Sequence, residues 1–351
     1  MEAPLLTVRT LNRTLLARQH LLERTTADPI AVMEGMGGIQ MQYAPAGYIG
    51  LWSRTRGFTR PMLTRALEER RAVQGTMLRA TIHTVSAADY WPTMAGIRRV
   101  NREWYGRVQA REIGSTDMAA VAHAMREELA AGPMRIGELT KRIAARGFPD
   151  RATAWAATWV DMLRVPPSGT WERRRADLYA LAEQWLPPTR EVAEDEGIEH
   201  LIGRYLGAFG PAPIADIANW MGLNVGQMRH VAEGMELRHY RAERGRTLLD
   251  LTDGRIADEA TPAPPRFLPV WDATLLVHAR RTQVLPEEHR PRIFSTRTPH
   301  SLNTFLVDGQ VAGSWRHTDG EIRLDPFGPL VAADRRALEE EAHGLAVLHA
   351  E

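Results

Sequence analysis

The residues near the start of the chain that are best suited to chemistry are two glutamines, Gln40 and Gln42, in the stretch "GGIQMQYAPAGYIGLWSR". Their spacing puts both amides on one face of an extended segment, with Ile39 and Met41 on the other, inward face. A glutamine carbonyl accepts a hydrogen bond and its NH2 group donates one, but neither takes up a proton near neutral pH. The pair can therefore orient a water molecule or a substrate group. It can equally hydrogen-bond a strand edge or solvent, because so short a motif has low specificity.

The surrounding sequence predicts the elements that position this pair. A short helix fits "DPIAVMEGM", with Asp28 as N-cap and Pro29 in its first position, and the following glycine pair ends it. The strand "IQMQ" comes next, followed by a helix "APAGYIGLWSR" and a helix "TRPMLTRALEERRAV" capped by Thr59. Two β-like runs, "GTMLRAT" and "HTVSA", complete the unit. This order is typical of a winged helix-turn-helix.

Similar orders of elements recur along the chain. Residues 116–186 contain three helical patterns and an apolar-to-basic segment, "VPPSGTWERRRADLYAL", and residues 190–252 contain three helices and a hairpin pattern. A proline-rich linker at 258–266 precedes two Asp-Gly hairpin signals, which predict a small β-barrel or a curled sheet, followed by a final helix. We therefore predict an α+β fold, mainly α, with three tandem winged helices and a C-terminal β-barrel. The predicted domains are residues 1–114, 115–188, 189–257 and 266–351.

Composition limits the classes of protein that fit. The 351 residues include no cysteine, so a disulfide framework or a thiolate nucleophile is excluded. The absence of a signal-like start and of a long apolar run indicates a cytoplasmic protein without a membrane partner. Residues 1–115 hold 16 arginines against nine acidic residues, whereas the whole chain has a net charge of +1. This basic part is compatible with a phosphate-facing surface, and equally with a solvated one.

Common cofactor and catalytic motifs do not fit the sequence. "GMGGIQ" precedes a strand where a phosphate-binding loop would follow one, and it lacks the Gly-Lys-Ser/Thr ending. The sequence contains neither a His-Glu-x-x-His zinc motif nor a Gly-x-Ser-x-Gly elbow. We expect no metal and no cofactor.

Several segments together resemble a known family. "GGIQMQYAPAGYIGLWSR", "RATIHTVSAADY", "FLPVWDATLLVHARR" and "FLVDGQVAGSW" are similar to segments of the AlkZ-like and YcaQ-like winged-helix DNA glycosylases, and the resemblance runs from about residue 8 to 345. It implies a C-shaped clamp on double-stranded DNA, excision of N7-alkylated guanine, including bulky adducts and interstrand crosslinks, and Gln40 and Gln42 as catalytic residues. Gln42 replaces the Asp of the YcaQ-like branch. The chain therefore looks like the AlkZ branch, which is often associated with self-resistance to a DNA-alkylating toxin.

Two amides suit the chemistry that this resemblance implies. N7 alkylation makes the guanine cationic, so it departs as a neutral base while positive charge develops on the sugar. We expect Gln42 to hold the attacking water and Gln40 to orient the sugar or the other side of that water, by positioning and dipole stabilisation. Lys141 is the only lysine and lies far in sequence from the pair. A Schiff-base step is therefore not expected, and we predict a monofunctional enzyme that leaves an abasic site. We also expect it to be a monomer that acts on nucleoid DNA.

Candidate DNA contacts are basic residues around the predicted helix-turn-helix, its wing and a C-terminal hairpin: Arg54, Arg56, Arg60, Arg79, His83, Arg316 and His317. Each could equally be a solvated surface residue. The alternative function is a non-enzymatic winged-helix transcription regulator, or a DNA-binding scaffold without catalytic activity. Three predicted winged-helix units in one chain favour a clamp on DNA over a transcription regulator.

Overall fold

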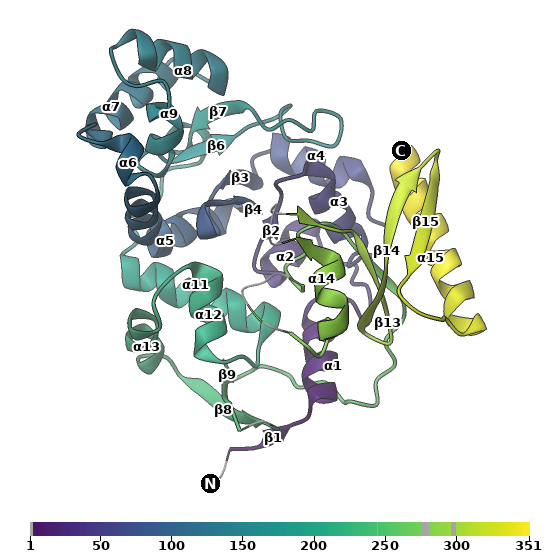
Figure 1. Cartoon of the computed structure of the whole chain (residues 1–351). Coiled ribbons are helices and arrows are strands. Elements are labelled where there is room, and N and C mark those ends of the chain that lie inside the picture. The colour runs from purple at the N-terminus through teal and green to yellow at the C-terminus, as the bar shows by residue number, and fades with distance from the viewer. Residues whose placement is uncertain (1–2, 244, 276–278, 280, 296–299) are drawn as a thin grey trace.

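The computed structural model describes residues 3–243, 245–275, 279, 281–295 and 300–351. Figure 1 shows β2 to β4 near the centre, with α7 to α9 at one end, α11 to α13 toward the other, and α15 along one side. Within the described ranges, every helix is too short or too polar to cross a lipid bilayer.

The first part of the chain builds the surroundings of the glutamine pair. Its elements are β1 (Leu5–Leu6), α1 (Val8–Arg18), α2 (Pro29–Gly35), β2 (Ile39–Gln40), α3 (Ala44–Trp52), α4 (Arg60–Glu68), β3 (Ala72–Thr76), a 3-10 turn (Leu78–Ala80), β4 (Ile82–Ser86), α5 (Ala87–Val108) and α6 (Ala110–Ile113). The predicted start of α2 is confirmed, because Asp28 accepts a hydrogen bond from the backbone N–H of Ile30 at 2.8 Å. The inward placement of Ile39 and Met41 is also confirmed, since both are buried.

The second and third parts are mainly helical. The second contains α7 (Met118–Leu129), β5 (Met134–Arg135), α8 (Ile136–Ala145), α9 (Ala152–Trp155), a 3-10 turn (Ala156–Thr158), β6 (Met162–Arg164), β7 (Leu178–Leu181) and α10 (Ala182–Trp185). The third contains α11 (Glu194–Phe209), α12 (Ile214–Met221), α13 (Val225–Glu233), β8 (Leu237–Ala242) and β9 (Thr247–Leu251).

The sheets join parts that the sequence pattern separates. One six-stranded sheet has the order β2-β4-β3-β6-β7-β5, and it crosses the predicted boundary at residue 114 where Gln74 and Gly75 of β3 pair with Arg164 and Leu163 of β6. A second sheet, β1-β8-β9, attaches the start of the chain to the third part through a parallel pairing of β1 with β8. The winged-helix assignment and the domain boundaries stay predictions.

The last part contains β10 (Arg266–Leu268), a 3-10 turn (Glu287–His289), α14 (Arg290–Ile293), β11 (Phe294–Ser295), β12 (His300–Ser301), β13 (Thr304–Val307), β14 (Gln310–Thr318), β15 (Glu321–Pro326) and α15 (Ala332–Ala350). Of the two arrangements that the hairpin signals predict, the closed β-barrel is wrong. In the described residues, the strands form an open sheet of order β10-β13-β14-β15, with β10 and β15 at its edges. The sheet does not need to close, because α15 covers its apolar face: Leu338 and Leu345 share one core with Phe267, Phe305 and Trp315.

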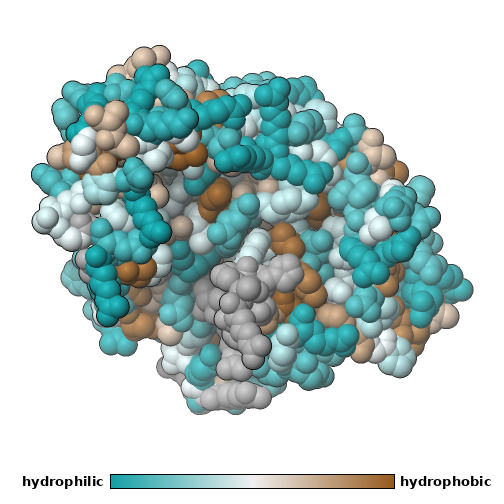
Figure 2. All heavy atoms as spheres, turned by 45° about the horizontal axis from the view of Figure 1, so that its top comes forward, coloured by the Kyte–Doolittle hydropathy of each residue, from teal (hydrophilic) through white to brown (hydrophobic). Residues whose placement is uncertain are grey.

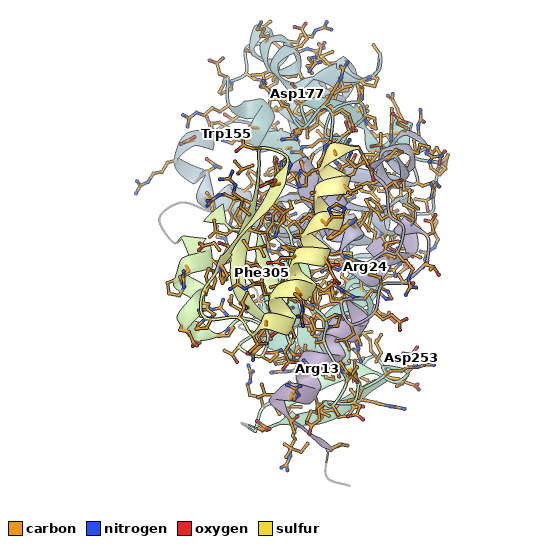
Figure 3. All side chains as sticks on the ribbon, turned by 90° about the vertical axis from the view of Figure 1, so that its right-hand side faces the viewer. Arg13, Arg24, Trp155, Asp177, Asp253 and Phe305 are labelled. Carbon is orange, nitrogen blue, oxygen red and sulfur yellow. The ribbon has the colours of Figure 1, made fainter. Side chains whose placement is uncertain are left out.

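This C-terminal unit packs directly against the elements around the glutamine pair. Tyr48 and Trp52 of α3 belong to the same core as Phe305 and Leu345. Figure 3 shows Phe305 and Arg24 near α15, and the Arg24 guanidinium is paired with Glu341 of that helix. The C-terminal sheet and α15 therefore pack against α3 in one hydrophobic core.

Candidate active site

The turn before β2 determines the direction in which the glutamine pair leaves the sheet. Gly37 and Gly38 have φ angles of 72° and 81°, a left-handed conformation that glycine adopts readily. A Cβ atom on Gly38 would lie 2.9 Å from Cγ1 of Val85, so only glycine lets the chain approach β4 this closely. The Met41 backbone N–H then donates to the carbonyl of Ile82 at 2.8 Å, which extends the pairing of β2 with β4 past Gln40.

The two amides contact one another. Nε2 of Gln40 donates to Oε1 of Gln42 at 2.9 Å, so the expectation that both lie on one face is confirmed. Gln40 is buried with 6% of its surface exposed, whereas Gln42 is exposed. Between them, the Met41 side chain points inward and its Sδ accepts a hydrogen bond from Oγ1 of Thr84 at 3.0 Å. Gln42 is thus the member of the pair that is exposed to solvent, and the hydrogen bond from the buried Gln40 holds its amide in place.

Arg79 belongs to this network. Its Nη2 donates to Oε1 of Gln40 at 3.4 Å, and its Nη1 donates to the carbonyl oxygen of Trp220 in α12. Burial lowers the pKa of Arg79 to about 10, so the guanidinium stays charged at neutral pH. Sequence reasoning proposed Arg79 as a DNA contact. In the structure its guanidinium hydrogen-bonds within the protein, and we do not retain it as a DNA contact.

His83 lies opposite Gln40 in the β2–β4 register and is buried, with 3% of its surface exposed. Burial, with a smaller contribution from the charge of Arg79, lowers the pKa of His83 to about 3. Its Nδ1 donates to the carbonyl of Thr81 at 3.2 Å. Because the imidazole is buried and not accessible to a phosphate in this structure, we do not retain His83 as a candidate DNA contact.

Arg54 and Arg56 have opposite environments although they are two residues apart. The Arg54 side chain is fully buried and pairs with Asp272 at 3.0 Å, so we do not retain it as a candidate DNA contact. It additionally donates to the Gly50 carbonyl and to Gln19 at 3.0 and 3.2 Å. Arg56 has a side chain that is 66% exposed and pairs with Glu23 at 3.8 Å, and it remains available to a phosphate.

The other predicted DNA contacts gather around one tryptophan. Trp171 follows β6 and packs edge-on against His349 of α15 with their ring centroids 5.0 Å apart. The Arg60 guanidinium lies 4.8 Å from the centroid of Trp171, and only 11% of its side chain is exposed. His317 stacks on His349 at 4.0 Å, and the adjacent Arg316 is exposed. Arg316 and His317 thus remain accessible, whereas Arg60 is mostly covered.

Two residues near the pair escaped sequence reasoning. Tyr43, which directly follows Gln42, is 43% exposed, and its hydroxyl accepts a hydrogen bond from Nη1 of Arg174 at 3.0 Å. Arg174 belongs to the segment "WERRR", and that run of arginines after a tryptophan is the signal that could have drawn attention to it. Its proximity to Tyr43, 131 residues earlier, could not be deduced from the sequence.

Lys141 is exposed on α8, and Figure 1 shows α8 at the end of the molecule away from β2. Among the residues that the structure describes, no three His, Asp or Glu side chains are grouped so that they could hold a metal ion.

Comparisons with known proteins agree with this architecture. The model of a family described as DNA glycosylase AlkZ-like matches residues 33–348. The interstrand DNA cross-link repair glycosylase of Streptomyces sahachiroi is 31% identical over 159 residues, an alignment that covers 42% of this chain and 42% of that protein. The solved structure of Streptomyces sahachiroi DNA glycosylase AlkZ matches with a TM-score of 0.82 at 20% identity, over 99% of this chain and 98% of that chain, which shows a common fold. Because the family model spans most of the sequence, this chain belongs to the AlkZ-like DNA glycosylase family.

Proposed function

We propose that this protein is a monofunctional DNA glycosylase that hydrolyses the N-glycosidic bond of N7-alkylguanine lesions in double-stranded DNA. The observation that carries the proposal is the exposed Gln42 amide, held by a hydrogen bond from Gln40 at 2.9 Å. Membership of the AlkZ-like family supports it and does not favour the alternative of a transcription regulator. The described part of the chain contains no carboxylate in the Gln40–Gln42–Arg79 network, so the proposed chemistry does not use a general base there.

The hydrogen bonds around the pair support separate roles for its members. Gln42 Oε1 accepts from Gln40 and has a second lone pair, which can accept a hydrogen bond from an attacking water. The lesion leaves as a neutral base because alkylation has already made it cationic, so the water needs orientation more than deprotonation. The amide oxygen also places a partial negative charge near the sugar, where positive charge develops.

The range of substrates is also part of the proposal. A relative is named as an interstrand DNA cross-link repair glycosylase, and we propose that this chain likewise accepts bulky N7 adducts or crosslinks, in self-resistance to a DNA-alkylating compound. Figure 2 shows that hydrophilic side chains cover much of one face, as a DNA-facing surface would require. We further propose that winged-helix units form a clamp and that a cytoplasmic monomer acts on nucleoid DNA.

The test is base release from duplexes that contain one N7-methylguanine or one bulky N7 adduct, detected by alkaline cleavage at the abasic site. We expect Gln40→Ala and Gln42→Ala to slow single-turnover release by on the order of 10²-fold. Both variants should still bind the duplex. Arg336→Ala, a change of an exposed arginine on α15, serves as the matched control and should keep the wild-type rate.

Strand cleavage is tested separately. Borohydride should trap no covalent complex, and Lys141→Ala should release base at the wild-type rate, since the proposed mechanism uses no amine. Failure of the wild-type protein to release any adduct, together with binding to one specific DNA sequence, would favour a regulator.

A further inference from the structure

The connection between β6 and β7, residues 165–177, is a well-fixed arginine-rich loop, and we call it the arginine loop. Oγ of Ser168 accepts from the backbone N–H of Asp177 at 2.7 Å and donates to the carbonyl of Arg175 at 2.7 Å. The Gly169 N–H donates to the carbonyl of Arg173 at 2.8 Å. These bonds close the loop on itself and hold the backbone at Arg173 and Arg175 in a defined position.

Two contacts fix the arginine loop to elements of the candidate active site. Nε2 of Gln74 in β3 donates to the carbonyl of Gly169 at 2.9 Å. The Trp171 side chain is buried and packs edge-on against Tyr48 of α3 with their ring centroids 5.7 Å apart. Figure 1 shows this connection extending from the sheet toward α4 and the C-terminal end of α15, and Figure 3 shows Asp177 beyond that end of α15. The loop therefore has a fixed position relative to α3, which begins two residues after Gln42.

One arginine of the loop reaches the residue next to the pair. The Nη1 atom of Arg174 donates to the hydroxyl of Tyr43 at 3.0 Å, and its guanidinium lies 5.7 Å from the centroid of the Tyr43 ring. Tyr43 and Gln42 are both exposed and adjacent in the chain. The charged loop and the amide that faces solvent are thus parts of one continuous surface.

The charge of this surface is positive. Arg173, Arg174 and Arg175 are all exposed, and together with Arg135 they line a hollow of about 380 Å³. Asp177 is the acidic residue of the hollow, and it pairs with Arg135 at 2.9 Å and with Arg175 at 3.3 Å. Within the described chain, the Arg173 guanidinium has neither an ion-pair nor a hydrogen-bond partner.

We propose that the arginine loop binds the DNA backbone at phosphates beside the lesion nucleotide, with Arg173 as its free phosphate ligand and Arg174 oriented by Tyr43. A planar guanidinium suits bidentate contact with a phosphate. Such contacts fix the register of the protein on the duplex without reading sequence, and a lesion-specific enzyme needs that property. A fixed loop loses little conformational freedom when DNA binds. This inference rests on the proposed function for the identity of the ligand.

The experiment measures affinity for an undamaged duplex as a function of salt concentration. Each lost phosphate contact makes the slope of log K against log [salt] less steep by about 0.9. We expect Arg173→Ala to make the slope less steep by the equivalent of about one phosphate contact. The double change Arg173→Ala with Arg175→Ala should make it less steep by the equivalent of about one to two contacts. Arg336→Ala on α15 should leave both affinity and slope at their wild-type values. The thermal unfolding midpoints of all variants should match, because these side chains are exposed.

The outcomes separate this inference from the proposed function. Equal slopes and affinities for wild type, Arg336→Ala and the loop variants would overturn the inference, even if the wild-type protein released N7-methylguanine. A reduced slope in the loop variants would support DNA contact by the loop even if the wild-type protein released no base. A loss of affinity with no change of slope would also overturn it, because phosphate contacts must displace counterions.

Discussion

Nη2 of Arg79 donates to Oε1 of Gln40 at 3.4 Å, while Nη1 of the same guanidinium binds the carbonyl of Trp220 near the C-terminal end of α12. Arg79 has a φ angle of 52°, a left-handed conformation that few non-glycine residues adopt. The turn therefore directs the guanidinium to both acceptors. With its oxygen facing Arg79, the Gln40 amide must turn its NH2 group toward Gln42. Arg79, in the 3-10 turn, thus fixes the orientation of the Gln40 amide, and it links the Gln40–Gln42 pair to α12.

This link predicts a kinetic defect in Arg79→Ala. Without the guanidinium, the Gln40 amide is free to rotate, and single-turnover base release at saturating enzyme should slow by about 10- to 100-fold. Affinity for an undamaged duplex should stay close to wild type, since the side chain is largely buried and bonded within the protein. The reverse pattern, a full rate with weakened and less salt-dependent binding, would return Arg79 to the list of phosphate contacts.

Arg54 and Arg56 predict two different kinds of defect. Arg54→Ala leaves the buried Asp272 carboxylate without its partner, and we expect the free energy of unfolding to fall by about 3–5 kcal/mol. Arg56→Ala should change that free energy by less than about 0.5 kcal/mol, because its side chain is exposed. If Arg56 contacts a phosphate, its removal should instead make the salt dependence of DNA binding less steep by about one contact. Urea unfolding and duplex titration of both variants separate the two effects.

Arg54 and Arg56 also illustrate which features of the structure could be predicted from the sequence. Local signals were sufficient for the cap at Asp28 and for the inward side chains of Ile39 and Met41, because capping and strand alternation involve near neighbours. The burial of Arg54 depends on Asp272, 218 residues later, and no local pattern reveals that pairing.

Long-range packing also explains the errors in the predicted fold. The hairpin signals before α15 were interpreted as a barrel, but whether a sheet closes depends on what covers its apolar face, and here α15 does so. Likewise, the pairing of β3 with β6 joins segments that each look like an independent unit in sequence. The Gln40–Gln42 pair could be found from the sequence, whereas its neighbours Arg79 and Arg174 reach it from other elements.

His83 predicts an acid-sensitive fold. Its pKa is lowered from 6.5 to about 3 by burial and by Arg79, so the folded state holds the imidazole neutral while the unfolded chain binds a proton below pH 6.5. The stabilising contribution is present above pH 6.5 and is lost as the pH falls toward 3, at up to about 1.4 kcal/mol per pH unit. We expect the free energy of unfolding to fall less steeply between pH 6.5 and 5 in His83→Gln than in the wild type. Equal slopes, measured by urea unfolding at several pH values, would contradict the assignment.

The two long helices α5 and α11 cross at Gly96 and Gly197, and this crossing predicts the most selective loss of stability. A Cβ atom on Gly197 would lie 2.4 Å from the backbone nitrogen of Gly96, and one on Gly96 would lie 2.8 Å from the carbonyl carbon of Gly197. Because the obstructing atoms are backbone, no side chain can move aside. We expect Gly197→Ala to force the helices apart and to cost about 1–3 kcal/mol in the free energy of unfolding.

The same helices contain matched controls for that change. Gly203 in α11 and Gly106 in α5 would place a Cβ atom in open space. Alanine there should be neutral or stabilise the protein by up to about 1 kcal/mol, because it lowers the backbone entropy of the unfolded chain and favours the helix. If Gly197→Ala lowers the free energy of unfolding and Gly203→Ala raises it, as measured by urea unfolding, the difference separates the effect of the helix crossing from that of helix propensity. Since α5 follows β4 directly and α11 leads into α12, whose Trp220 carbonyl binds Arg79, a displaced crossing should also slow base release in Gly197→Ala and not in Gly203→Ala.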